Sequence, residues 1–259
     1  MAQTPAEPER EVEDSFDRLV DEGRVRLARP LLTQIGTGLL GGIDIGTGLL
    51  AYLVVENQTG NPLLASLAFS IGFVALLLAH SELFTENFLV PVAAVVARAG
   101  TVGQLLALWG VSLAANLVAG WGITWLIVFA RPDLRETGIE AARRYAELPV
   151  DGHSLTLAVL AGLVITLLTR MQHATDSLGV KLVPALLFGA LLVGAQLFHS
   201  VLDSMLIFTG IHYGADYGYG DWLPRLGWSV LGNLLGGVGL VTAIRLLRAR
   251  HRVADARGH

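Results

Sequence analysis

The stretch AHSELFTENF, residues Ala79 to Phe88, places polar side chains in the middle of a long apolar segment. An apolar run leads into it and an Ala- and Val-rich run follows, so that residues 63–97 are too long for one simple membrane span. Polar and ionisable groups at membrane depth are costly and mark functional sites. Non-helical backbone is tolerated there only inside protein or beside a water-filled cavity. We therefore predict a broken membrane helix at this stretch.

The composition of the whole chain also indicates a membrane protein. Of its 259 residues 53% are hydrophobic and only 15% are charged, well below the quarter that is typical of soluble domains. The absence of cysteine excludes disulfides and thiolate metal sites. The sequence contains no Walker A motif for ATP coupling and no Cys/His cluster for a metal. We expect no cofactor and no nucleic-acid partner.

Six apolar segments have about the ~20 residues needed to cross a bilayer, or more. They are residues 31–55, 63–97, 102–130, 154–172, 180–208 and 223–248. The fifth, like the second, is too long for a simple span and contains a polar island, at 199–204. The predicted fold is therefore an all-α membrane protein with six transmembrane helices, of which helices 2 and 5 are broken. The domains predicted are a cytoplasmic tail (1–29), a transmembrane domain (30–249) and a second cytoplasmic tail (250–259).

The distribution of arginine predicts the orientation of these spans. Residues 1–29 hold five arginines and the C-terminal tail is also rich in arginine, whereas loops 55–62 and 209–222 contain neither Lys nor Arg. Because cytoplasmic loops carry the excess of Lys and Arg, we expect both termini in the cytoplasm, in a plasma or inner membrane. The mixed charges of residues 131–153 fit less well, but such a long segment constrains topology only weakly. The polar N-terminus does not resemble a signal peptide.

Two pairs of motifs indicate an internal repeat. SLAANLVAGWG (112–122) and SVLGNLLGGVG (229–239) share Ser, Asn, Leu and two glycines at an offset of 117, including Asn116 with Asn233 and Gly120 with Gly237. The pairs His80-Ser81 and His199-Ser200 coincide at an offset of 119. Spans 1–3 and 4–6 are therefore predicted to be two copies of a three-helix unit. An odd number of spans inverts the second copy, as in many transporters, and brings both polar islands to one pathway.

These motifs resemble those of the formate/nitrite transporter family. The broken second helix of the family carries a Glu/Asp-Leu-Phe-Thr stretch, which Glu82 to Thr85 match, and an upstream Ala-Phe-Ser-x-Gly, which Ala68 to Gly72 match. The His-Ser of its broken fifth helix is matched by His199-Ser200. Its Asn-Leu/Ile-x-Gly motifs are matched by residues 116–120 and 233–237. The resemblance covers about residues 30–248.

The resemblance implies an aquaporin-like protomer in a homopentamer, with one pore per protomer. It also implies passage of small monovalent anions or their acids, such as formate, nitrite or hydrosulfide. Apolar side chains pinch the family's pore on either side of the histidine, and by position these are Phe69, Phe73 and Leu192. Thr85 would be the hydroxyl that faces His199.

Several positions depart from the family pattern. Glu86 stands where the family has a small residue, Asp203 where an Asn is typical, and Gly162 where the fourth helix usually offers an Asn. The lysine near the start of that helix is absent, since Lys181 is the only lysine. A rival interpretation is therefore the same scaffold passing a neutral solute or a cation.

The polar islands supply the candidate functional residues. A neutral His199 could donate a hydrogen bond to an anion, or relay a proton, or serve only to tie two half-helices together. His80 need not line the pore. We expect Glu82 to cap backbone N–H groups at the break. Glu86 and Asp203, with Asn87 in the same polar set, could face a vestibule or pair with arginines.

The sequence thus predicts a channel or secondary transporter for small monovalent anions or weak acids, embedded in the lipid bilayer. Transport could be coupled to protons through His199. The alternative of another class is a non-transporting membrane scaffold whose tails recruit partners. FHSVLDS (198–204) contains His, Ser and Asp, but the chain has no Gly-x-Ser-x-Gly elbow. We therefore do not expect an enzyme.

Overall fold

The computed structural model describes residues 7–258, and in them every regular element is a helix. The elements are α1 (Glu7–Leu27), α2 (Leu31–Thr59), α3 (Pro62–Phe69), α4 (Ile71–Ala79), η1 (Phe84–Phe88), α5 (Val90–Val96), α6 (Val102–Ala130), η2 (Pro132–Leu134), α7 (Arg135–Ala146), α8 (Gly152–Gln172), α9 (Leu178–Gly194), α10 (Ser200–His212), α11 (Tyr219–Leu234), η3 (Leu235–Thr242), α12 (Ala243–Arg248) and α13 (Arg250–Gly258).

Five of the described helical segments are long and apolar enough to cross a membrane. They are Leu31–Thr59, Pro62–Ala79, Val102–Ala130, Gly152–Gln172 and Tyr219–Arg248. The predicted fifth span, residues 180–208, is instead divided between α9 and α10, each of which is shorter. The predicted second span is also interrupted, since residues 80–83 separate α4 from η1. Both breaks therefore lie inside apolar segments.

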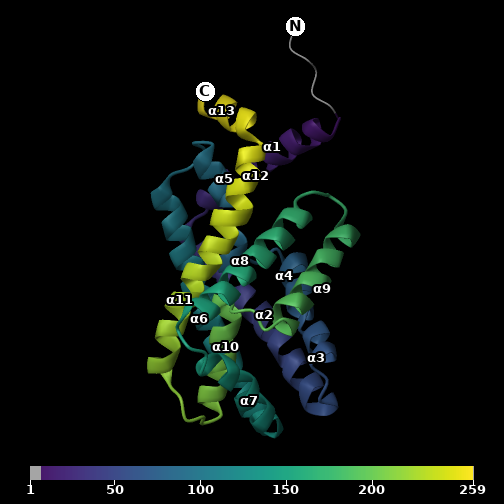
Figure 1. Ribbon diagram of the computed structural model, residues 1–259, viewed down its shortest axis with the longest axis vertical. Coiled ribbons are helices and arrows are strands. Elements are labelled where there is room, and N and C mark those ends of the chain that lie inside the picture. The colour runs from purple at the N-terminus through teal and green to yellow at the C-terminus, as the bar shows by residue number, and fades with distance from the viewer. Residues whose placement is uncertain (1–6, 259) are drawn as a thin grey trace.

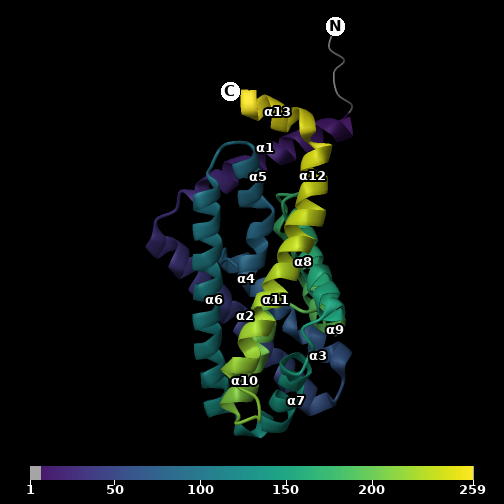
Figure 2. The ribbon, with the colours of Figure 1, turned by 60° about the vertical axis from the view of Figure 1, so that its left-hand side comes forward.

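The long helices run along the length of the molecule, and amphipathic helices lie at its two ends (Figures 1 and 2). Within the bundle, α2 packs along α6, and α8 packs along α11 and η3. At one end, here the α1 end, α1 packs against α5. At the other, the α7 end, α7 packs against α10. Each half-helix that follows a break is thus covered by the amphipathic helix of its own half of the chain.

Glycines allow the main helices to approach closely, as expected where no hydrophobic force drives helices together in lipid. A Cβ at Gly42 on α2 would meet the backbone of Asn116 on α6. A Cβ at Gly162 on α8 would run into the backbone of Asn233 on α11. The second contact leaves no room at residue 162 for the Asn side chain that the family resemblance would place there.

Candidate functional site

Asn116 holds the first break open. Its Nδ2 donates to Gly38 O (2.7 Å) and Glu82 O (3.0 Å), and its Oδ1 accepts from Phe84 N (2.8 Å). The side chain is fully buried. A broken helix at membrane depth frees backbone groups that need partners inside the protein, and Asn116 supplies them on both sides of Leu83.

Asn233 does the same at the second break. Its Nδ2 donates to Ala158 O and Phe198 O (both 2.9 Å), and its Oδ1 accepts from Ser200 N (3.0 Å). This side chain is also fully buried. The two asparagines that the sequence paired at an offset of 117 therefore make the same three hydrogen bonds.

The backbone at the breaks corrects one pairing made from the sequence. Since Asn116 binds Phe84 N and Asn233 binds Ser200 N, the breaks correspond at an offset of 116. At this offset His80 (φ 52°) matches Gln196 (φ 51°), and both residues adopt the left-handed conformation that ends a half-helix. His199 therefore corresponds to Leu83, not to His80. The shared His-Ser letters misled because their offset of 119 is three residues longer than the offset of the breaks.

His199 and Thr85 meet where the two breaks face each other. Thr85 Oγ1 lies 2.9 Å from His199 Nε2, and both side chains are buried. His199 Nδ1 accepts a hydrogen bond from Leu202 N at 3.2 Å, which makes His199 the N-cap of α10. A neutral imidazole whose Nδ1 is an acceptor carries its proton on Nε2. The fold thus selects the tautomer that donates to Thr85.

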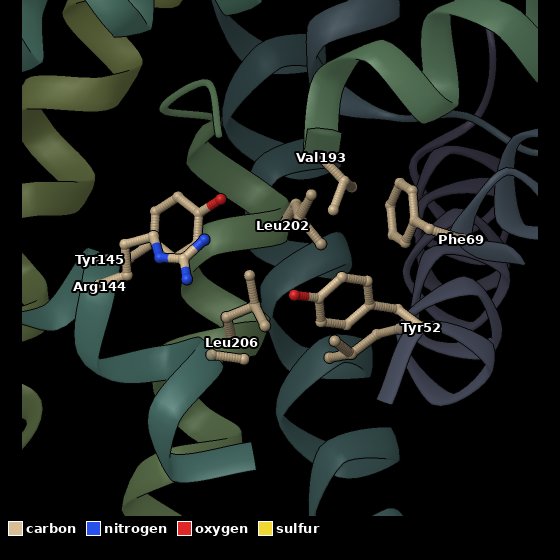
Figure 3. A pocket seen from close by; sticks show the side chains of 9 residues that line it. Tyr52, Phe69, Arg144, Tyr145, Val193, Leu202 and Leu206 are labelled. Carbon is tan, nitrogen blue, oxygen red and sulfur yellow. The ribbon is translucent and has the colours of Figure 1, made fainter. Parts of the chain in front are cut away.

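The three apolar residues assigned to the constriction are all buried, each 1% exposed: Phe69, Phe73 and Leu192. The rings of Phe69 and Phe73 pack edge to face, with centroids 6.0 Å apart. Phe69 also lines a narrow cavity at the α7 end, of about 10 Å³, which we call the α7-side cavity (Figure 3). Its lining residues are Leu49, Tyr52, Phe69, Ala141, Arg144, Tyr145, Val193, Leu202 and Leu206. An apolar wall thus lies next to this cavity.

A wider cavity of about 370 Å³ lies at the α1 end, and we call it the α1-side vestibule. Its lining includes His80, Ser81, Glu82 and Glu86 from the break region together with Arg18, Glu22, Arg26 and Arg29 from the N-terminal segment. His80 is exposed here and is not part of the Thr85–His199 pair. The N-terminal segment therefore contributes charged groups to the vestibule.

Glu82 does not cap the break as expected from the sequence. It forms ion pairs with Arg29, and with Arg26 at 3.6 Å. The cap is Glu86, whose Oε2 accepts from Leu83 N at 3.2 Å. The sequence did not indicate this because the partners of Glu82 lie more than fifty residues upstream. Asn87 is buried and its Oδ1 also accepts from Arg26, at 3.2 Å.

A second contact joins α1 to the end of α8. His173 Nε2 lies 2.9 Å from Glu22 Oε2, and Arg26 Nη2 donates to Glu22 Oε1 at 2.5 Å. Burial alone would raise the pKa of Glu22, but the hydrogen bond with His173 and the charge of Arg26 lower it to about 2. The carboxylate of Glu22 is therefore stabilised in its charged form.

Asp203, unlike Glu22, has no hydrogen bond or ion pair to its carboxyl group within the described residues. It is 2% exposed, and neither carboxyl oxygen has a hydrogen-bond partner within the described part of the chain.

Across residues 7–258 no group of three or more His, Cys, Asp or Glu side chains gathers in a way that could hold a metal ion. Hydrogen bonds of Asn116 and Asn233 and the ion pair of Glu82 with Arg29 connect the groups around the two breaks.

Comparison with known proteins identifies the family. The family model described as formate/nitrite transporter matches residues 13–247. The chain belongs to the formate/nitrite transporter family. Two solved structures share the fold of this family member: an FNT family ion channel (TM-score 0.83, 19% identity, 91% of this chain and 98% of the other) and a pentameric formate channel with formate bound (TM-score 0.72, 21% identity, 85% and 98%).

Among proteins of known sequence, this formate/nitrite transporter family member is 24% identical to the inner membrane protein YfdC of Escherichia coli strain K12, over 93% of this chain and 80% of the relative. It is 22% identical to the transporter YrhG of Bacillus subtilis strain 168, over 90% and 92%. The chain is therefore a multi-pass membrane channel or transporter. Its family and its structural neighbours are channels and transporters, not enzymes.

Sequence reasoning overlooked two groups of residues in this family member. The N-terminal arginines were assigned only to topology, yet Arg26 and Arg29 reach Glu82. Arg144 and two tyrosines, Tyr52 and Tyr145, line the α7-side cavity. The only sequence signal for the second group was the mixed charge of residues 131–153, which include Arg144 and fit the predicted topology poorly.

Proposed function

We propose that this protein is a channel or secondary transporter for small monovalent anions or their weak acids, with formate as the test solute. The observation that carries this proposal is the buried pair of Thr85 and His199, held 2.9 Å apart between two helix breaks. Polar and ionisable side chains at membrane depth are costly, and they therefore mark candidate sites for a solute. Formate is also the solute bound in the pentameric formate channel that shares this fold.

The tautomer of His199 suggests how the pair would act. Because Nε2 donates to Thr85 Oγ1, the hydroxyl hydrogen of Thr85 remains available to an anion. A second proton on His199 would have to occupy Nδ1, which already accepts from Leu202 N. We therefore favour His199 as the residue that orients Thr85 over His199 as a proton relay.

The apolar side chains of Phe69, Phe73 and Leu192 are proposed to form the constriction. They offer no hydrogen bond to replace the water that an anion would lose. Desolvating an isolated charge is far more costly than desolvating a neutral group. A weak acid that picks up its proton before it enters would avoid most of this cost. We therefore expect faster passage at lower external pH.

We further propose six membrane spans arranged as two inverted repeats, with α3 to α5 and α9 to α10 as the broken spans. The matching hydrogen bonds of Asn116 and Asn233 support the repeat, as do the left-handed residues His80 and Gln196. The α1 and α13 helices lie at the same end (Figure 1), which supports our placing both termini in the cytoplasm. A homopentamer in the plasma or inner membrane is proposed from the solved pentameric relative and from YfdC.

The test is uptake into proteoliposomes of formate, nitrite, lactate and chloride at pH 5 and pH 7. We expect formate or nitrite flux, faster at pH 5, and a loss of that flux in His199→Asn. The matched control is His80→Asn, because Asn tolerates the left-handed backbone of residue 80. Absence of flux for all four anions at both pH values would refute the proposed function.

A further inference from the structure

The α7-side cavity is lined by three side chains that can donate hydrogen bonds. They come from separate elements: Tyr52 from α2, and Arg144 and Tyr145 from α7. Figure 3 shows the hydroxyl of Tyr52 pointing toward the side on which Arg144 and Tyr145 lie. The rest of the lining is apolar, including Phe69 and Leu202. Donors are thus concentrated next to the proposed constriction.

The described part of the protein supplies no acceptor to these three donors. Among residues 15–257, whose side chains are described, the side chains of Arg144, Tyr52 and Tyr145 form no hydrogen bond and no ion pair. Tyr145 is only 5% exposed as a whole residue, and it is part of the cavity lining. Buried polar groups in folded proteins are nearly always hydrogen-bonded. Three donors that line one cavity and bind no acceptor in the described protein are therefore free to bind an acceptor ligand there.

Two carboxyl groups lie near the cavity but do not line it. Glu56 lies four residues after Tyr52 on α2, and Asp203 on α10 lies near Tyr145. Neither carboxylate belongs to the lining, and neither forms an ion pair with Arg144. A cation would need several oxygen ligands that face it, whereas this cavity presents a permanently charged guanidinium beside its two phenol hydroxyls. The chemistry therefore fits an anion.

We propose that Arg144, Tyr52 and Tyr145 form a binding site for a small monovalent oxyanion or carboxylate at the α7 mouth of the pore. This inference rests on the proposed function, because it gives the transported anion a first binding site. Arg144 neutralises the charge, and the two phenol hydroxyls replace water as the anion reaches Phe69. The cavity of about 10 Å³ has room for one water-sized group. Because Arg144 is exposed, its side chain is free to shift outward, so that the cavity widens and the guanidinium still contacts a larger anion.

The test measures the initial rate of formate uptake into proteoliposomes against formate concentration. We expect Arg144→Gln to raise the apparent KM roughly tenfold with little change in maximal rate, and Arg144→Lys to recover part of it. Tyr145→Phe is expected to raise the KM by roughly threefold, since it removes one donor and keeps the ring. The matched control is Arg143→Gln, which removes the same charge from the neighbouring position of α7. Arg143 pairs with Glu147 at 3.7 Å and does not line the cavity.

A second measurement detects binding without transport. Saturation-transfer NMR from the purified protein to formate is expected to give a signal that weakens in Arg144→Gln and Tyr145→Phe but not in Arg143→Gln. An unchanged KM and an unchanged NMR signal in Arg144→Gln would overturn this site while leaving the proposed function intact. An equal effect of Arg143→Gln would also overturn it, because the cause would be general surface charge. If the wild type transports no anion, the proposed function fails, and the NMR comparison still decides whether the cavity binds formate.

Discussion

Replacement of Asn233 by alanine should destabilise the protein by removing all the hydrogen bonds that close the second break. The side chain is fully buried and makes three bonds, to Ser200 N, Ala158 O and Phe198 O. Hydrogen bonds between membrane helices contribute ~0.6 kcal/mol each on average, and bonds in proteins about 1 kcal/mol. Three bonds therefore give a loss of about 2–3 kcal/mol in the free energy of unfolding.

The assay is thermal unfolding of the purified protein in detergent, followed by intrinsic fluorescence. A loss of this size should lower the Tm by roughly 4–12 °C. Asn116→Ala should have a similar effect, because Asn116 makes the equivalent bonds at the first break. The control Asn57→Ala, on the exposed end of α2, removes a single exposed hydrogen bond from Thr137 and should lower the Tm much less. A shift of less than about 2 °C in Asn233→Ala would refute the role that we assign to these asparagines.

Three further predictions concern other parts of the molecule. Gly162→Asn should lower the free energy of unfolding by about 1–3 kcal/mol through overpacking, which would appear as a lower Tm. Gly239→Ala is the control, because residue 239 has open space around it and its substitution should leave the Tm unchanged. Equal Tm shifts in the two variants would contradict the close contact at Gly162. The pKa of Glu22 is lowered to about 2, so the stability that its carboxylate contributes should be present above pH 4.5 and lost as pH falls through 2. The Tm difference between wild type and Glu22→Gln should therefore shrink over this range. A constant difference would argue against the ionised carboxylate. Phe69→Ala should raise the ratio of lactate to formate uptake about tenfold, because a smaller side chain would widen the proposed constriction. Phe129→Ala on the exposed face should leave this ratio unchanged. An unchanged ratio in Phe69→Ala would show that this ring does not form the constriction.

Much of the framework was predictable because it depends on local composition. Helix breaks at residues 80–83 and 195–199 follow from polar residues inside segments too long for one span. The pairing of Asn116 with Asn233 was visible as two similar motifs, and their hydrogen bonds are equivalent. The pairing of His80 with His199 was wrong, because equal letters do not report which residue ends a half-helix.

The side-chain partners were less accessible to sequence reasoning. The capping role went to Glu86 instead of Glu82, whose charge is taken up by Arg26 and Arg29. Arg144 gave no motif, and its meeting with Tyr52 requires α7 to fold back over the bundle. Such pairs join distant parts of the chain, and a single sequence carries no record of the distance between them.

The sequence by itself determined that this chain is a helical membrane protein, where its helices break and which family it resembles. These properties depend on hydrophobic length, turn chemistry and short motifs, each of which lies within a few residues along the chain. Only the tertiary structure decided which nitrogen of His199 faces Thr85, which carboxylate caps the break, and which donors converge on the α7-side cavity. Hydrogen bonds and ion pairs act over about 3–4 Å in space, so their partners exist only after the two halves of the chain have packed together.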